Sequence, residues 1–211
     1  MNRLISDPVR VASSTASPPR RAWRVGAFGG LLVAAVLAGW SAGRWSARSP
    51  ADDSVEAGFA RDMAVHHAQA VEMAMMILPR TRDPELRALA TDIALTQQAQ
   101  IGQLQGWLDA WGLPQTGRTA AMTWMGHPAQ GLMPGMALPD EIARLRRASV
   151  PEAERQFLTL MIRHHEGGIA MARAAVERSR RPEVVRLASA MVQAQAVEIT
   201  AMRALLTRRV P

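Results

Sequence analysis

An internal repeat is the feature of this 211-residue sequence that most constrains its fold. When the chain is shifted by 98 residues, 59–108 aligns with 157–206 without a gap, and 15 of the 50 aligned positions are identical. The identical positions include two His-His pairs and residues around them, namely Phe59/Phe157, Met63/Met161, His66/His164, His67/His165, Met73/Met171 and Pro84/Pro182. A match of this length indicates two copies of one structural unit.

Each copy has the periodicity of a helical hairpin. Apolar residues and one histidine recur at steps of three and four, as on one face of a helix: Phe59, Met63, His66, Ala70, Met73 and Ile77 in the first copy, and Phe157, Met161, His164, Gly168, Met171 and Ala175 in the second. Pro84 and Pro182 then suit the first turn of a second helix. The two hairpins predict an all-α fold in which four long antiparallel helices bury their apolar faces as a four-helix bundle.

Local signals place the ends of these helices. Gly112 and Pro114 are expected to end the second helix of the first copy. Ser149 and Glu152 form a predicted capping box at the start of the third long helix. The connection between the copies, 112–150, is long and contains a predicted short helix from Asp140 to Ala148.

The positive charge of the chain is concentrated near its N-terminus. The net charge is +7, but residues 1–50 hold seven Arg and one acid, whereas 51–211 hold 18 Arg and 17 acids. A nucleic-acid-binding domain would carry its basic patch on the folded part, so we expect no nucleic-acid partner. Residues 25–43 are 19 uncharged and mostly apolar residues with arginines on both sides. They predict a transmembrane helix with its N-terminus in the cytoplasm.

The chain is therefore expected to have four parts. These are a cytoplasmic tail at 1–24, a transmembrane anchor at 25–43, a linker at 44–54, and the bundle domain at 55–211 with its repeats at 59–108 and 157–206. The alternative to an anchor is a cleaved signal peptide, which would make the body a secreted protein. Both interpretations place the body outside the cytoplasm.

The His-His pairs and the methionines beside them are the main candidates for chemistry. His66 and His164 are expected to point into the bundle, with His67 and His165 at the flank, because neighbours on a helix point about 100° apart. Met63 and Met161 lie one turn before the inward histidines. The chain has no Cys, which excludes thiolate sites. Thioether and imidazole ligands favour Cu(I).

Two other interpretations remain open at this stage. No Glu stands three residues before either His pair, so the di-iron pattern of helical bundles is absent, although Glu72 and Glu166 lie close enough to orient an imidazole. Alternatively, the methionines fill the core and the inward histidines are hydrogen-bonded by polar residues of the second helices, for which the candidates are Gln97, Gln98, Gln195 and Glu198.

The connection supplies a second group of candidate ligands. It contains four methionines and one histidine within 15 residues: Met122, Met125, His127, Met133 and Met136. A loop has no core to fill, so methionines there suggest a soft-metal ligand role. The alternative is a lid that packs on the bundle.

The duplicated motif resembles the bacterial domain of unknown function (DUF) family 305. The resemblance rests on Phe59-x3-Met63-x2-His66-His67-x5-Met73-Ala74, its copy at 157–172, and the Met-Pro-Gly-Met connection, and it covers about residues 55–208. It implies a ferritin-like four-helix bundle that is secreted or membrane-anchored and associated with copper or silver. It also implies that the metal ligands are Met63, His66, His67, Met73, Met161, His164, His165 and Met171. The second copy departs from the first by having Glu166-Gly167-Gly168 where the first has Ala68-Gln69-Ala70.

Together, these features predict a membrane-anchored, extracytoplasmic protein that sequesters or transfers Cu(I), with Ag(I) as a further ligand, through Met and His. We expect a binding protein rather than an enzyme. The alternatives are a ferritin-like oxidase that uses iron or another metal, and a metal-free interaction or envelope-stress module. The expected partners are a metal ion and the membrane; the sequence identifies no protein partner.

Overall fold

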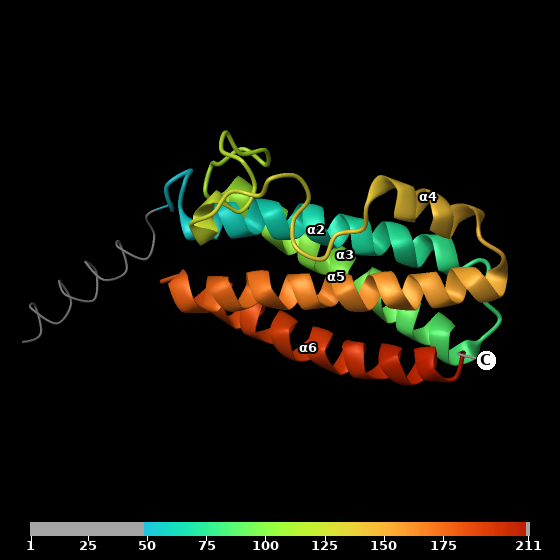
Figure 1. Cartoon of the computed structure of the whole chain (residues 1–211). Helices are drawn as coiled ribbons and strands as arrows, with labels where there is room; N and C mark the ends of the chain where they lie inside the picture. The colour runs from blue at the N-terminus through green and yellow to red at the C-terminus, as the bar shows by residue number, and fades with distance from the viewer. Residues whose placement is uncertain (1–48, 210–211) are drawn as a thin grey trace, which may run out of the picture. The chain divides into compact units, whose positions relative to one another are not determined.

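The computed structural model describes residues 49–209, and all regular secondary structure in this range is helical (Figure 1). The elements are α2 (Val55–Ile77), α3 (Pro84–Ala110), a short 3-10 turn η1 (Thr123–Met125), α4 (Pro139–Arg147), α5 (Val150–Arg178) and α6 (Pro182–Thr207). The predicted all-α class is thereby confirmed for this part of the chain. The predicted anchor at 25–43 lies outside the described residues. None of the helices within 49–209 has the length and apolar character needed to cross a membrane.

The helix ends follow local sequence signals, with one exception. Pro84 and Pro182 begin α3 and α6 as predicted, and α4 starts and ends within one residue of its predicted bounds. Ser149 precedes α5, but its side chain makes no capping hydrogen bond, so the predicted capping box is wrong. The Glu152 carboxylate instead accepts a hydrogen bond from Gln156 Nε2 at 2.8 Å and pairs with an arginine one turn along the same helix.

The four long helices pack as two hairpins joined along one seam (Figure 1). Helix α2 packs against α3, α5 packs against α6, and α2 and α5 run in opposite directions where they bring the two hairpins together. The core consists of two hydrophobic clusters, and each draws on both copies of the repeat. One cluster includes Phe59, Met63, Met171 and Met191, and the other includes Met73, Phe157, Met161 and Met202.

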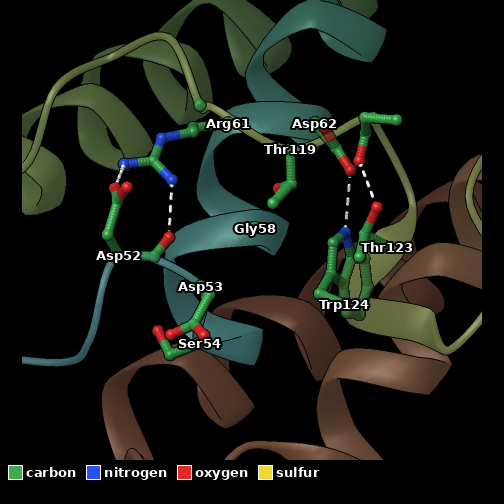
Figure 2. A pocket seen from close by; sticks show the side chains of 11 residues that line it. Asp52, Asp53, Ser54, Gly58, Arg61, Asp62, Thr119, Thr123 and Trp124 are labelled. Atoms are coloured by element: carbon green, nitrogen blue, oxygen red, sulfur yellow. Dashed lines mark hydrogen bonds and ion pairs between the residues drawn. The ribbon is translucent and has the colours of Figure 1, made fainter.

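The first part of the connection is tied to the start of α2 by polar contacts (Figure 2). One carboxylate oxygen of Asp62 accepts hydrogen bonds from the backbone N–H of Met122 at 2.7 Å and from Trp124 Nε1 at 2.8 Å. The Trp124 ring meets Phe59 edge-on, with 5.8 Å between ring centroids. Arg61 donates to the carbonyl of Pro114 at 2.9 Å. The connection is therefore a packed layer over α2 rather than a free loop.

The second part of the connection crosses both central helices. On α2, the Gln69 amide donates to Ala137 O at 3.0 Å and accepts from Ala137 N at 2.6 Å. On α5, the carbonyl of Pro134 lies so close that a Cβ placed on Gly167 would stand 2.0 Å from its oxygen. Gly167 is the repeat equivalent of Gln69. The two copies differ here because the Gln69 side chain on α2 binds the connection, whereas on α5 the connection packs so closely that Gly167 can carry no side chain.

Gly167→Ala is expected to destabilise the protein by about 1–3 kcal/mol, because a methyl group would collide with Pro134. Gly102→Ala is the matched control: it lies inside α3 with nothing within 4 Å of the added Cβ. There the higher helix propensity of alanine should stabilise the protein by about 0.5–1 kcal/mol. Urea unfolding measures both. Equal stabilisation by the two substitutions would contradict the close approach of the connection to α5.

Candidate functional site

The two inward histidines meet at the centre of the seam between α2 and α5. The rings of His66 and His164 are fully buried, and their centroids are 3.8 Å apart with 34° between the ring planes. His67 and His165 follow on either side at 6.4 Å and 6.3 Å from their neighbours, and both are also fully buried. The structure therefore brings the His pairs of the two copies into one contiguous group of four imidazoles.

Each of the four rings uses Nε2 to bond an oxygen. His66 Nε2 lies 3.0 Å from Pro134 O, and His164 Nε2 lies 3.0 Å from the backbone oxygen of His66. His67 Nε2 lies 2.7 Å from Gln100 Oε1 on α3, and His165 Nε2 lies 2.6 Å from Glu198 Oε2 on α6. Carbonyl and carboxylate oxygens only accept, so the proton of each neutral ring resides on Nε2.

The other ring nitrogen is left free in all four histidines. The Nδ1 atoms of His66, His67, His164 and His165 are buried and have no hydrogen-bond partner among the described residues. With the proton on Nε2, each Nδ1 carries a lone pair. Buried polar atoms are nearly always paired, so four unpaired lone pairs in one group call for an explanation.

Burial keeps the rings of His66, His67 and His164 uncharged at neutral pH. It lowers the pKa of His66 from 6.5 to about 4 and that of His67 to about 3, and it places the pKa of His164 well below 6.5. The neighbouring imidazoles lower each pKa further, because two adjacent rings cannot both hold a positive charge in the core. These three rings are thus neutral and can donate electron pairs without first losing a proton.

The four candidate thioethers are also fully buried. Because α2 and α5 are antiparallel, Met63 of the first copy shares a hydrophobic cluster with Met171 of the second, and Met73 shares the other cluster with Met161. Each side of the central His66–His164 contact therefore has methionine from both copies. All four side chains pack in the core, a placement that suits core filling, and each methionine lies within two helical turns of a histidine on its own helix.

The expected carboxylate and amide partners of the histidines need correction. Glu72 and Glu166 are exposed, and they pair with Arg146 at 3.3 Å and Arg203 at 2.8 Å, away from the imidazoles. The polar atoms of the Gln97 side chain and Oε1 of Gln195 make no hydrogen bond within the described residues, and Gln98 is exposed. Of the four predicted partners, only Glu198 bonds a histidine, and it bonds the flanking His165.

Gln100 is a hydrogen-bond partner of the histidines that the sequence did not single out. Gln100 bonds His67 and follows it by 33 residues, and Glu198 bonds His165 and follows it by the same number. The 98-residue shift also aligns Gln100 with Glu198. Comparing polar positions across the repeat, rather than identical ones alone, would have found this pair.

The methionines of the connection belong largely to the core. Met122 and Met133 are buried in the cluster that contains Met63, and Met125 and Met136 pack against it partly buried. The expectation that the connection has no core to fill is therefore wrong. His127 is exposed. Across residues 49–209, no three His, Asp or Glu side chains lie together in a way that could hold a single metal ion.

Folding stability is expected to fall in mild acid. The pKa values of His66, His67 and His164 are lower in the folded protein than in the unfolded chain, so the unfolded chain binds more protons between about pH 6.5 and pH 4. The free energy of unfolding should therefore be unaffected by these histidines above about pH 7 and should decline below about pH 6.5. The slope should approach about 4 kcal/mol per pH unit for three rings. Urea unfolding at about pH 7.5, 6 and 5 measures this change in the free energy of unfolding.

The exposed His127 provides the control for that titration. His127→Gln should keep the pH profile of the unaltered protein, because this side chain lies on the surface. A stability that stays constant from neutral pH down through the window would show that the buried rings are not held neutral.

Comparisons with known proteins agree with this architecture. A DUF305 protein from Streptomyces coelicolor, described as a presumed secreted protein, is 48% identical; the match covers 75% of this chain and 96% of that chain with a TM-score of 0.72. A DUF305 fragment from Deinococcus radiodurans is 39% identical, with 73% and 96% covered and a TM-score of 0.63. CopM in its Cu(II)-bound form is 27% identical, with 74% and 98% covered and a TM-score of 0.61. CopM is also known in Cu(I)-bound and Ag-bound forms.

Among curated proteins, the uncharacterized protein L153 of Acanthamoeba polyphaga mimivirus is 43% identical over 47 residues, which is 22% of this chain and 31% of that protein. The family described as domain of unknown function (DUF305) matches residues 56–206, across the four long helices and the connection between the hairpins. The chain therefore belongs to the DUF305 family.

Proposed function

We propose that this protein binds Cu(I), and also Ag(I), outside the cytoplasm and thereby sequesters or transfers the ion. The observation that carries the proposal is the group of four buried imidazoles whose Nδ1 lone pairs have no partner. The copper- and silver-bound forms of CopM support it, because the matches to these forms cover 99% and 96% of the CopM chains. The ligands proposed are His66, His67, His164, His165, Met63, Met73, Met161 and Met171.

The chemistry of these side chains fits a soft monovalent cation. Thioether sulfur selects Cu(I) over harder metals, and imidazole also suits copper. The Nε2 of each ring is held by an oxygen, which fixes the ring orientation as in other His-ligated sites and leaves Nδ1 available to a metal. An ion bound through Nδ1 would leave all four of these hydrogen bonds in place.

The alternative functions receive less support. The predicted oxidase would use Glu72 and Glu166 beside the histidines, but both pair with arginines at the surface. The carboxylate that does bond a histidine, Glu198, is a single one and contacts only the flanking His165 among the described residues. A metal-free interaction module would treat the imidazoles as core residues, but it offers no reason for four unpaired Nδ1 atoms in one group. The metal-binding test below distinguishes this last alternative from the proposal.

Copper loading of the full chain in the presence of a reductant should give a stoichiometric complex of the protein with Cu(I). Replacing both central rings, His66→Gln and His164→Gln, should lower the affinity at least about tenfold, since each substitution removes a ligand. Met63→Leu with Met161→Leu should also weaken binding while keeping the core filled. The measurement is competition with a chromophoric Cu(I) chelator under anaerobic conditions.

Met75→Leu is the matched control, because Met75 is an exposed methionine of α2 that is not a proposed ligand. Its affinity should equal that of the unaltered protein. If the unaltered protein takes up neither Cu(I) nor Ag(I), the proposed function fails and the metal-free module becomes the better interpretation.

The location outside the cytoplasm and the membrane anchor are part of the same proposal. The apolar stretch 25–43 and the arginines before it support a single-pass anchor, and the description of the Streptomyces coelicolor relative as presumed secreted supports export. The classification of the helical domain as a ferritin-like four-helix bundle is likewise proposed, and the pairing of the two hairpins supports it.

Fractionation of cells that express the full chain tests the anchor. The protein should stay in the membrane fraction after a high-pH carbonate wash, and protease added to spheroplasts should digest the body from outside. Deletion of residues 25–43 should leave the protein in the cytoplasm. Recovery of a shortened soluble form outside the cytoplasmic membrane would instead support cleavage of a signal peptide.

A further inference from the structure

The two copies of the repeat differ in the charge of the group that holds each flanking histidine. His67 Nε2 bonds Gln100 Oε1 at 2.7 Å, and His165 Nε2 bonds Glu198 Oε2 at 2.6 Å. The two partners occupy equivalent positions on α3 and α6, and the two bonds have nearly the same length. The geometry is therefore conserved between the copies, while a neutral amide in one is replaced by a carboxylate in the other.

The Glu198 carboxylate has no arginine partner within residues 49–209; its ion-pair contact there is with His165. This distinguishes it from Glu72 and Glu166, whose charges are paired with arginines. The side chain of Glu198 is 12% exposed, and that of His165 is fully buried. A charge in such surroundings acts strongly on its neighbours, because little water screens it.

A carboxylate behind an imidazole strengthens that imidazole as a ligand. It accepts the Nε2–H bond, raises electron density on the ring and so makes Nδ1 a better donor. It also supplies a negative charge that offsets the charge of a bound cation. An amide oxygen orients the ring in the same way but brings no net charge.

We propose that Glu198 makes the α5–α6 half of the centre the position that binds the cation more tightly, and that the α2–α3 half, where Gln100 replaces it, binds more weakly and exchanges more readily. This inference rests on the proposed binding of Cu(I) or Ag(I) and names the residue that makes the two halves unequal. Glu198 and Gln100 are positioning residues that act through His165 and His67.

Exchange of the two side chains tests the inference. Glu198→Gln gives both halves the amide, and Gln100→Glu gives both the carboxylate. Cu(I), buffered by a chromophoric chelator under anaerobic conditions, is titrated into the full chain in mild detergent, and Ag(I) serves as a second probe without redox chemistry. Glu198→Gln should weaken the tightest binding step about tenfold, and Gln100→Glu should tighten the weaker step by a similar factor.

Imidazole nitrogen NMR of the metal-free variants separates charge from structure. The amide of Glu198→Gln can still accept the Nε2–H bond, so His165 should keep its proton on Nε2 and its free Nδ1. Lower affinity with an unchanged tautomer supports the charge argument. Lower affinity with an altered tautomer would mean that Glu198 acts only by holding the ring in place, and would overturn it.

The remaining outcomes are also decisive. If a single ion binds, its affinity should fall with His165→Gln and Glu198→Gln more than with His67→Gln and Gln100→Ala, and the reverse order would overturn the inference. If the unaltered protein and the Glu198→Gln variant bind Cu(I) with equal affinity, the inference is overturned while the proposed function stands. If the unaltered protein binds neither Cu(I) nor Ag(I), both fall together.

Discussion

The contact between the His66 and His164 rings sets the conditions for the rest of the bundle. Burial and mutual repulsion both favour the neutral form of two imidazoles whose centroids are 3.8 Å apart in the core. A neutral ring still has one N–H, and a buried N–H must find an acceptor. One acceptor is the carbonyl of Pro134 in the connection, and the other is the backbone oxygen of His66 itself. The central contact therefore requires both the close pairing of α2 with α5 and the passage of the connection across them.

This requirement explains where the duplication loses its symmetry. The helices and the hydrophobic clusters use equivalent residues from both copies, but the copies are joined by one connection, and its Pro134 carbonyl bonds the His66 ring. Gln69 binds the connection on α2, while Gly167 leaves space for it on α5. The second copy departs from the first after its His pair because its helix receives the backbone of Pro134 and Gly135 at that point.

Periodicity and proline placement were enough to predict the helices and the two histidines that face inward, because these depend on residues within one helix. Contacts between helices depend on their register, which the sequence does not display. For this reason Gln97 was expected to bond a histidine, whereas Gln100, one turn along, does so. The burial of Met122 and Met133 also required knowledge of how the connection packs on α2.

The charge of the centre links its structure to the kind of ion it suits. The neutral imidazoles of His66, His67 and His164 and the four thioethers bring no charge, and Glu198, which bonds His165, brings a formal −1. A monovalent cation beside this carboxylate would leave the buried group close to neutral, whereas a divalent ion would leave one positive charge uncompensated in the core, which is costly. Soft donors and a single carboxylate that is only 12% exposed therefore favour Cu(I) and Ag(I) on electrostatic grounds as well as through ligand softness.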